Sequence, residues 1–258
     1  MPVLVAMGLL VAIMAAVRST WSPCGLSMLS SITPLGERGR GNRFRRTAAW
    51  FIVGAVTGGA TLGAAAGLLA RGWSVLGVPD RTTLAIGALS AGLAVLGDLG
   101  LLGFRIPVLR RQVNERWLDQ FRGVIYGVGF GWQIGVGLAT YVMTTGVFLA
   151  IALAVLNARF FVALAVGATF GTVRGLAVLV SARATTPEAL RRLHRRMDQL
   201  SVPVRRATLV VEAAAVVALA ASWWTPSLLV VLPAGAVSVV GLRLVPVLRR
   251  RRGVLAPP

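Results

Sequence analysis

The sequence predicts an all-α polytopic membrane protein: a helix bundle of about seven transmembrane helices, built as an inverted 3+3 repeat plus one extra helix. Three observations lead to this prediction. Hydrophobic residues make up 56% of the chain and charged residues only 14%, too little polar surface for a soluble globule of 258 residues. Arginine-rich blocks separate apolar runs long enough to cross a bilayer. A ten-residue pattern occurs once in each half of the chain.

The apolar runs between the arginine-rich blocks define the predicted spans. These are 2–35, 48–70, 82–104, 123–156, 160–181, 207–222 and 227–245. The first and fourth exceed the ~20 residues of one straight crossing. Ser22-Pro23 interrupts the first, and four glycines between residues 129 and 137 interrupt the fourth. Both are therefore predicted to contain a broken helix.

The repeated pattern reads GATLGAAAGL at 59–68 and GATFGTVRGL at 167–176. Glycines at i, i+4 and i+8 share one helix face and let another backbone approach closely. The predicted packing residues are Gly59, Gly63, Gly67, Gly167, Gly171 and Gly175. Because three spans separate the copies, they enter the membrane in opposite senses. This predicts a first repeat over 1–104, a second over 105–222, and an extra span with a basic tail over 223–258.

All basic residues are arginine, which excludes a Walker A loop or a Schiff-base lysine. Of the 27 arginines, 22 fall in loops 36–47, 105–122 and 182–206 and at the C-terminal end, and three fall in the opposite loops. The positive-inside rule then predicts an inner-membrane protein with its N-terminus outside and its C-terminus cytoplasmic. The net charge of +19 indicates anionic lipid headgroups as a partner rather than nucleic acid.

An amphipathic helix is predicted over 186–200. Thr186 is a good cap and Pro187 suits a first turn. Arginines cover most of the helix surface. The remaining face is apolar and consists of Leu190, Leu193, Met197 and Leu200. This pattern predicts an interfacial helix lying on anionic lipid, with His194 on its solvated surface.

Charged residues inside the predicted spans are expensive in hydrocarbon and indicate pairing or function. Asp98, Arg174 and Glu212 each fall ~10 Å from a predicted cytoplasmic helix end. Their similar depth permits a structural ion pair of Arg174 with Asp98 or Glu212, and a proton-coupled role is the open alternative. Arg18 lies ~25 Å along the first span, where it is expected to face a polar cavity or a carboxylate.

Folds built from inverted repeats place their working site between the broken helices. The candidate substrate-site residues are Arg18, Trp21, Pro23, Cys24, Ser30, Trp132, Gln133 and Thr140. Cys24 and His194 are the only residues of their kinds, so no metal site of cysteine and histidine and no intrachain disulfide is expected. No cofactor is predicted, and no set of acid, base and nucleophile indicates a hydrolytic enzyme.

The element Ser22-Pro23-Cys24-Gly25 in a long first span, with a broken fourth span, resembles the CcdA/DsbD family of transmembrane thiol–disulfide carriers, the transmembrane region of cytochrome c biogenesis proteins. The resemblance implies a catalytic cysteine at position 24, paired with a second in the fourth span, and a thioredoxin-like or cytochrome maturation partner. Residues 129–137 contain no cysteine, so the intrachain redox cycle cannot run in this chain.

Three functions remain open at this point. The first is a membrane carrier on that scaffold, which moves a small solute or ion between the broken helices. The second is a thiol redox protein that acts through Cys24 with a partner protein. The third is a non-transporting membrane assembly factor whose helices form a docking platform.

Overall fold

The structure, a computed structural model, describes residues 2–101 and 120–224. Its elements are α1 (Pro2–Ser19), α2 (Pro23–Ser31), α3 (Pro34–Gly39), α4 (Phe44–Val75), α5 (Asp80–Leu99), α7 (Gly123–Val136), α8 (Gly146–Leu156), α9 (Phe160–Leu176), the 3₁₀ helix η1 (Ala177–Arg183) and α10 (Pro187–Trp224). These residues contain no strand, so the all-α prediction is confirmed. The predicted span 227–245 and most of the loop 105–122 lie outside the described residues.

Among the residues that the structure describes, five helices are long and apolar enough to cross a membrane: α1, α4, α5, α9 with its continuation η1, and α10. They match five predicted spans, which supports a multi-pass membrane protein. The predicted fourth span forms the two shorter helices α7 and α8.

Both predicted helix breaks are present. In the first span, α1 ends at Ser19, and the Ser22 side chain caps α2 by accepting a hydrogen bond from the Gly25 amide at 3.1 Å. Pro23 then occupies the first turn, where its missing N–H costs nothing. In the fourth span, α7 ends before Gly137, whose φ of +72° is accessible to glycine without strain.

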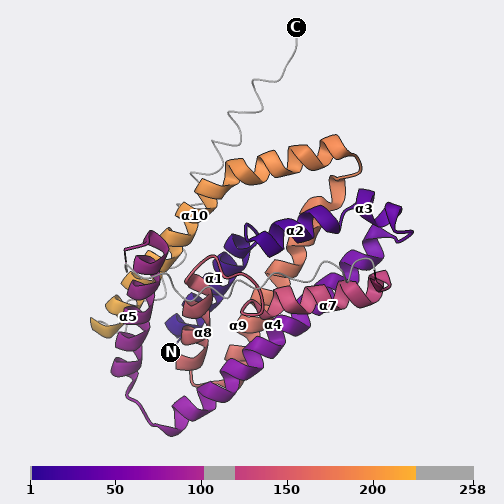
Figure 1. Cartoon of the computed structure of the whole chain (residues 1–258). Coiled ribbons are helices and arrows are strands. Elements are labelled where there is room, and N and C mark those ends of the chain that lie inside the picture. Colours follow the sequence, from indigo (N-terminus) through magenta and orange to yellow (C-terminus); the bar gives the residue numbers. More distant parts are fainter. Residues whose placement is uncertain (1, 102–119, 225–258) are drawn as a thin grey trace.

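The two copies of the repeated pattern pack directly on each other. Helix α4 packs against both α7 and α9 (Figure 1). A Cβ atom on Gly167 would lie 2.4 Å from the Gly59 carbonyl oxygen and 2.5 Å from the Gly63 Cα. Backbone therefore meets backbone at this crossing, as the glycine spacing predicts.

The contacts at this crossing are reciprocal. A Cβ on Gly63 would lie 2.7 Å from the Ala163 carbonyl oxygen, and one on Gly171 would lie 2.2 Å from the Ala55 carbonyl oxygen. The two alanines hold equivalent positions, four residues before the first glycine of each copy. If the two halves are exchanged, the contact of Gly63 with Ala163 becomes the contact of Gly171 with Ala55. We propose on this basis that α4 and α9 are related by an inverted repeat.

Helix α10 joins two segments that the sequence pattern treats separately. It is continuous from Pro187 to Trp224 and contains Pro203, which lacks the amide hydrogen needed in a helix interior. Its first half crosses the top of the molecule in Figure 1, and its second half descends beside α5. Leu193 and Met197 of the first half join an apolar cluster with residues of α2. Part of the apolar face of the predicted interfacial helix over 186–200 therefore covers protein, and its contact with lipid stays a prediction.

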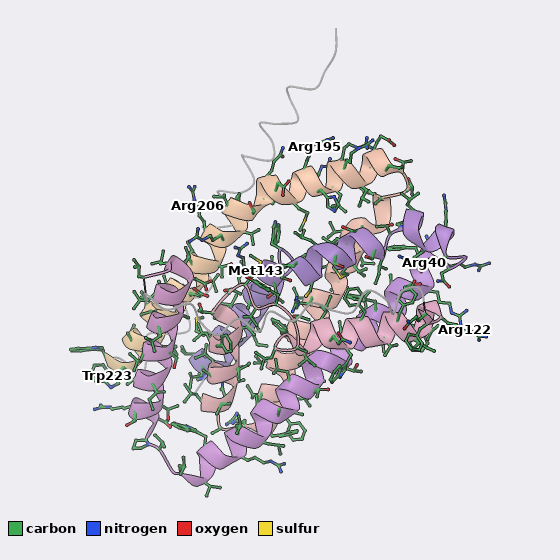
Figure 2. The ribbon with its side chains drawn as sticks, in the orientation of Figure 1. Arg40, Arg122, Met143, Arg195, Arg206 and Trp223 are labelled. Atoms are coloured by element: carbon green, nitrogen blue, oxygen red, sulfur yellow. The ribbon has the colours of Figure 1, made fainter. Side chains whose placement is uncertain are left out.

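The arginine-rich segments lie along one side of the molecule, away from the end of α10. Figure 2 shows Arg40, Arg122, Arg195 and Arg206 along the upper and right rim, and Trp223 at the opposite end. This arrangement agrees with the arginine-rich loops meeting on one membrane face.

Cysteine labelling tests the predicted sidedness. In a Cys24→Ser background, Gly41→Cys and Arg195→Cys are expected to react with a membrane-impermeant maleimide only after the cells are opened. Val75→Cys, at the far end of α4 and 85% exposed, is expected to react in intact cells. Labelling of the first two variants from opposite faces would contradict the predicted topology and the inverted repeat.

Candidate functional site

Arg174 on α9 links the two broken helices. Its side chain is buried, and its Nη1 donates to the Ile134 carbonyl at 2.9 Å and to the Thr140 hydroxyl at 3.3 Å. Its Nη2 donates to the Ser19 carbonyl at 3.4 Å. Ser19 and Ile134 belong to the last turns of α1 and α7, where carbonyls lack partners within their helices and carry partial negative charge. The two helix ends therefore stabilise the buried cation.

The predicted ion pair of Arg174 is wrong. Within residues 2–101 and 120–224, no salt bridge joins it to Asp98 or Glu212. The two carboxylates instead meet the first turn of α8. The physical reason is the direction of the helices, since carboxyl-terminal ends attract the Arg174 cation and the amino-terminal end of α8 donates hydrogen bonds to Asp98.

Asp98 on α5 accepts three hydrogen bonds from residues at the start of α8. Its Oδ1 accepts from the Thr145 amide at 2.7 Å and from the Thr145 hydroxyl at 2.6 Å. Its Oδ2 accepts from the Thr144 hydroxyl at 2.6 Å. Thr145 is the N-cap residue of α8, so Asp98 fastens α5 to this helix start.

Two candidate residues near the first break, Trp21 and Ser30, face the amphipathic half of α10, whereas Cys24 lies within electrostatic reach of Arg174. Cys24 is buried in the first turn of α2. The Trp21 Nε1 donates to the Met197 carbonyl at 2.8 Å, and the Ser30 hydroxyl donates to the Leu26 carbonyl at 2.8 Å. Ser30 also contacts His194 Nε2 at 3.0 Å, so His194 is part-buried against α2 rather than solvated as predicted.

The candidates from the fourth span point in different directions. Trp132 is 41% exposed and donates to the Thr61 hydroxyl at 3.3 Å, so it does not share a cavity with Trp21. Gln133 is half-buried. Thr140 is buried and donates to the Gly137 carbonyl at 3.0 Å while accepting from Arg174. Of the predicted set, only Thr140 meets the end of α1 through Arg174.

Sequence reasoning missed a buried carboxylate at the arginine-rich end. Glu37 of α3 is fully buried and accepts hydrogen bonds from the Tyr126 hydroxyl, from the Thr47 hydroxyl at 2.6 Å and from Arg40 Nη1 at 3.2 Å. It thereby connects α3, α4 and α7. The available signal was a single acid in a loop that holds five arginines.

Sequence reasoning also missed a cavity of about 430 Å³ at the opposite end of the molecule. It lies where the turn between α4 and α5 meets the turn between α8 and α9, beside the start of α1. Its lining includes Trp73, Asp80, Thr83, Asn157 and Arg159. An aromatic ring together with both signs of charge suits a small polar ligand or a peptide side chain. These residues come from separate turns without a shared motif, so no sequence pattern predicts the cavity.

Comparison with known proteins finds relatives named methylamine utilization protein MauF. The chain is 33% identical to the protein from Methylophilus methylotrophus over 173 residues, which are 63% of this chain and 58% of that protein. It is 32% identical to the one from Methylorubrum extorquens over 171 residues, 63% and 58% of the two chains. It is 31% identical to the one from Paracoccus denitrificans over 179 residues, 66% and 62% of the two chains.

The chain spans about three fifths of the length of these curated relatives. No family model matches it, and no solved structure matches it. The resemblance to the CcdA/DsbD family is therefore wrong, because the relatives carry a different name and nothing points to that family. The element that suggested it has a structural explanation: Ser22 caps α2 and Pro23 begins it, as the start of any helix after a break favours.

Proposed function

We propose that this chain is a non-transporting membrane accessory protein of methylamine utilization, whose helix bundle serves as a docking platform for other proteins of that process. The observation that carries the proposal is the similarity to relatives that are each named a methylamine utilization protein. The length and hydropathy of the helices support a membrane location.

The packing of the interior favours a platform over a carrier. Alternating access requires one repeat to rock against the other. Here α4 and α9 approach so closely at Gly59 and Gly167 that no Cβ atom fits between them. In addition, Arg174 already binds the carbonyls of Ser19 and Ile134, which are polar groups that a solute between the broken helices would use. These contacts support a bundle that holds one conformation.

Gene deletion tests the proposal. Loss of the gene for this chain is expected to abolish growth with methylamine as the nitrogen source and to leave growth with ammonium unchanged. Uptake of labelled methylamine should remain at the wild-type level, because a platform moves no solute. Re-expression of the intact chain should restore growth.

Two outcomes would contradict this function in different ways. Normal growth of the deletion strain with methylamine would separate the chain from methylamine utilization. If the deletion strain lost both methylamine uptake and growth with methylamine, the result would favour a carrier instead of a platform.

A further inference from the structure

We propose that Glu212 and Asp98 form a proton-binding site within the membrane, in which Glu212 holds the proton and Asp98 carries the negative charge. Glu212 lies on α10 and Asp98 on α5, two helices that pack side by side (Figure 1). Both carboxyl groups reach the start of α8. The site does not depend on the function proposed above.

Hydrogen-bond donors and cations surround the Asp98 carboxylate. All three of its hydrogen-bond donors belong to Thr144 and Thr145, at the positive end of α8. Arg18 on α1 lies within electrostatic reach of its carboxylate. Arg205 donates to the Asp98 backbone carbonyl at 3.2 Å, which places a second cation close by.

The surroundings of Glu212 lack such donors. Its side chain is 1% exposed, and neither carboxylate oxygen accepts a hydrogen bond from any residue that the structure describes. The Thr144 hydroxyl faces it, but the single hydroxyl hydrogen of Thr144 is directed to Asp98. An ionised carboxylate without partners is far too costly in a low-dielectric interior, so such a group takes up a proton.

The charged groups around Glu212 fit this assignment. Asp98 faces it from α5, Arg205 precedes it on α10, and Arg18 lies beyond Asp98 on α1. The start of α8 contributes Thr144 and Gly146, which do not titrate near neutral pH. Two neighbouring carboxyl groups in such different environments separate into one acid and one anion.

The geometry favours a proton over a metal ion. A hard cation needs several oxygen ligands, yet the Asp98 oxygens already accept hydrogen bonds that a cation would have to displace. In the described ranges, no cluster of three acidic, histidine or cysteine side chains is available for a metal. A proton requires only Glu212. Gly146 provides the space, because a Cβ at this position would lie 2.9 Å from Glu212 Oε1.

Infrared spectroscopy of the purified chain in lipid bilayers tests the site. At neutral pH the wild-type chain is expected to show the carbonyl stretch of a protonated carboxylic acid, and Glu212→Gln should remove it. Glutamine is a neutral isostere of the protonated acid, so this variant should keep the wild-type melting temperature. Glu188→Gln is the matched control: Glu188 lies on the same helix with a 59% exposed side chain, and its substitution should leave the signal unchanged.

A second variant identifies the source of the signal. Gly146→Ala presses a methyl group toward Glu212 Oε1 and should shift the frequency of the stretch without removing it. An unshifted signal, or a wild-type chain without a signal that depends on Glu212, would overturn the proposal. So would a melting temperature that rises with sodium, but not with choline, in the wild type and not in Glu212→Gln, because the site would then hold a metal ion.

Discussion

Gly167→Ala is expected to prevent correct assembly of the bundle, although it adds only one methyl group. The new Cβ would lie 2.4 Å from the Gly59 carbonyl oxygen and 2.5 Å from the Gly63 Cα. These are backbone atoms of a packed helix, so no side chain can rotate to make room. We expect a loss of about 3 kcal/mol, the upper end for an overpacked core. The fraction of monodisperse protein on size-exclusion chromatography after detergent extraction measures the effect.

Glycine-to-alanine substitutions at two other positions are expected to raise the stability of the protein or leave it unchanged. A Cβ at Gly72 in α4 or at Gly92 in α5 would meet no heavy atom of residues 2–101 and 120–224 within 4 Å. Alanine is a better helix former than glycine by about 1 kcal/mol, so Gly72→Ala and Gly92→Ala should match or exceed the wild type in thermal stability. If Gly167→Ala were as stable as these two controls, α4 and α9 could not cross as closely as described.

The sequence predicted this crossing only in part. Two glycine rows at helical spacing are enough to predict two closely packed helix faces, because only a backbone contact needs so many residues without a Cβ. Neither glycine row, however, predicts that the helix it packs against is the one that carries the other copy of the pattern. A further row on α4 was missed, since Gly54 and Gly58 approach α7 backbone at Val128 and Trp132 without belonging to the repeat.

The charged side chains show the limit of the sequence more clearly. Position along a span predicts the depth of Asp98, Arg174 and Glu212, but it contains no information on the direction in which each side chain leaves its helix. Asp98 and Arg174 bind the ends of helices, and these ends exist only because the two predicted spans are broken. His194 illustrates the same limit, because the amphipathic pattern predicts its helix but not that Ser30 of α2 lies beside it.

Arg174→Met is expected to be strongly destabilising as well. Methionine is similar in length and suits an apolar interior, but it donates no hydrogen bond to the carbonyls of Ser19 and Ile134 or to the Thr140 hydroxyl. The Ser19 and Ile134 carbonyls each keep one backbone hydrogen bond, from the Ser22 and Gly137 amides, but each loses a charged donor. A hydrogen bond to a charged group contributes about 1.5–3 kcal/mol, so we expect a total loss of about 3 kcal/mol. For a chain of this size that corresponds to a fall in melting temperature of about 6–12 °C.

Arg159→Met provides the matched control, because Arg159 is exposed just before α9 and its loss should change stability by no more than about 0.5 kcal/mol. Arg174→Lys separates charge from geometry: it keeps the cation, but a single ammonium group cannot reproduce the planar fork that reaches both helix ends. Hydrogen exchange should therefore increase at the ends of α1 and α7 in both Arg174 variants and not in the control. Equal exchange and equal melting temperatures in Arg174→Met and Arg159→Met would mean that Arg174 does not hold the two broken helices together.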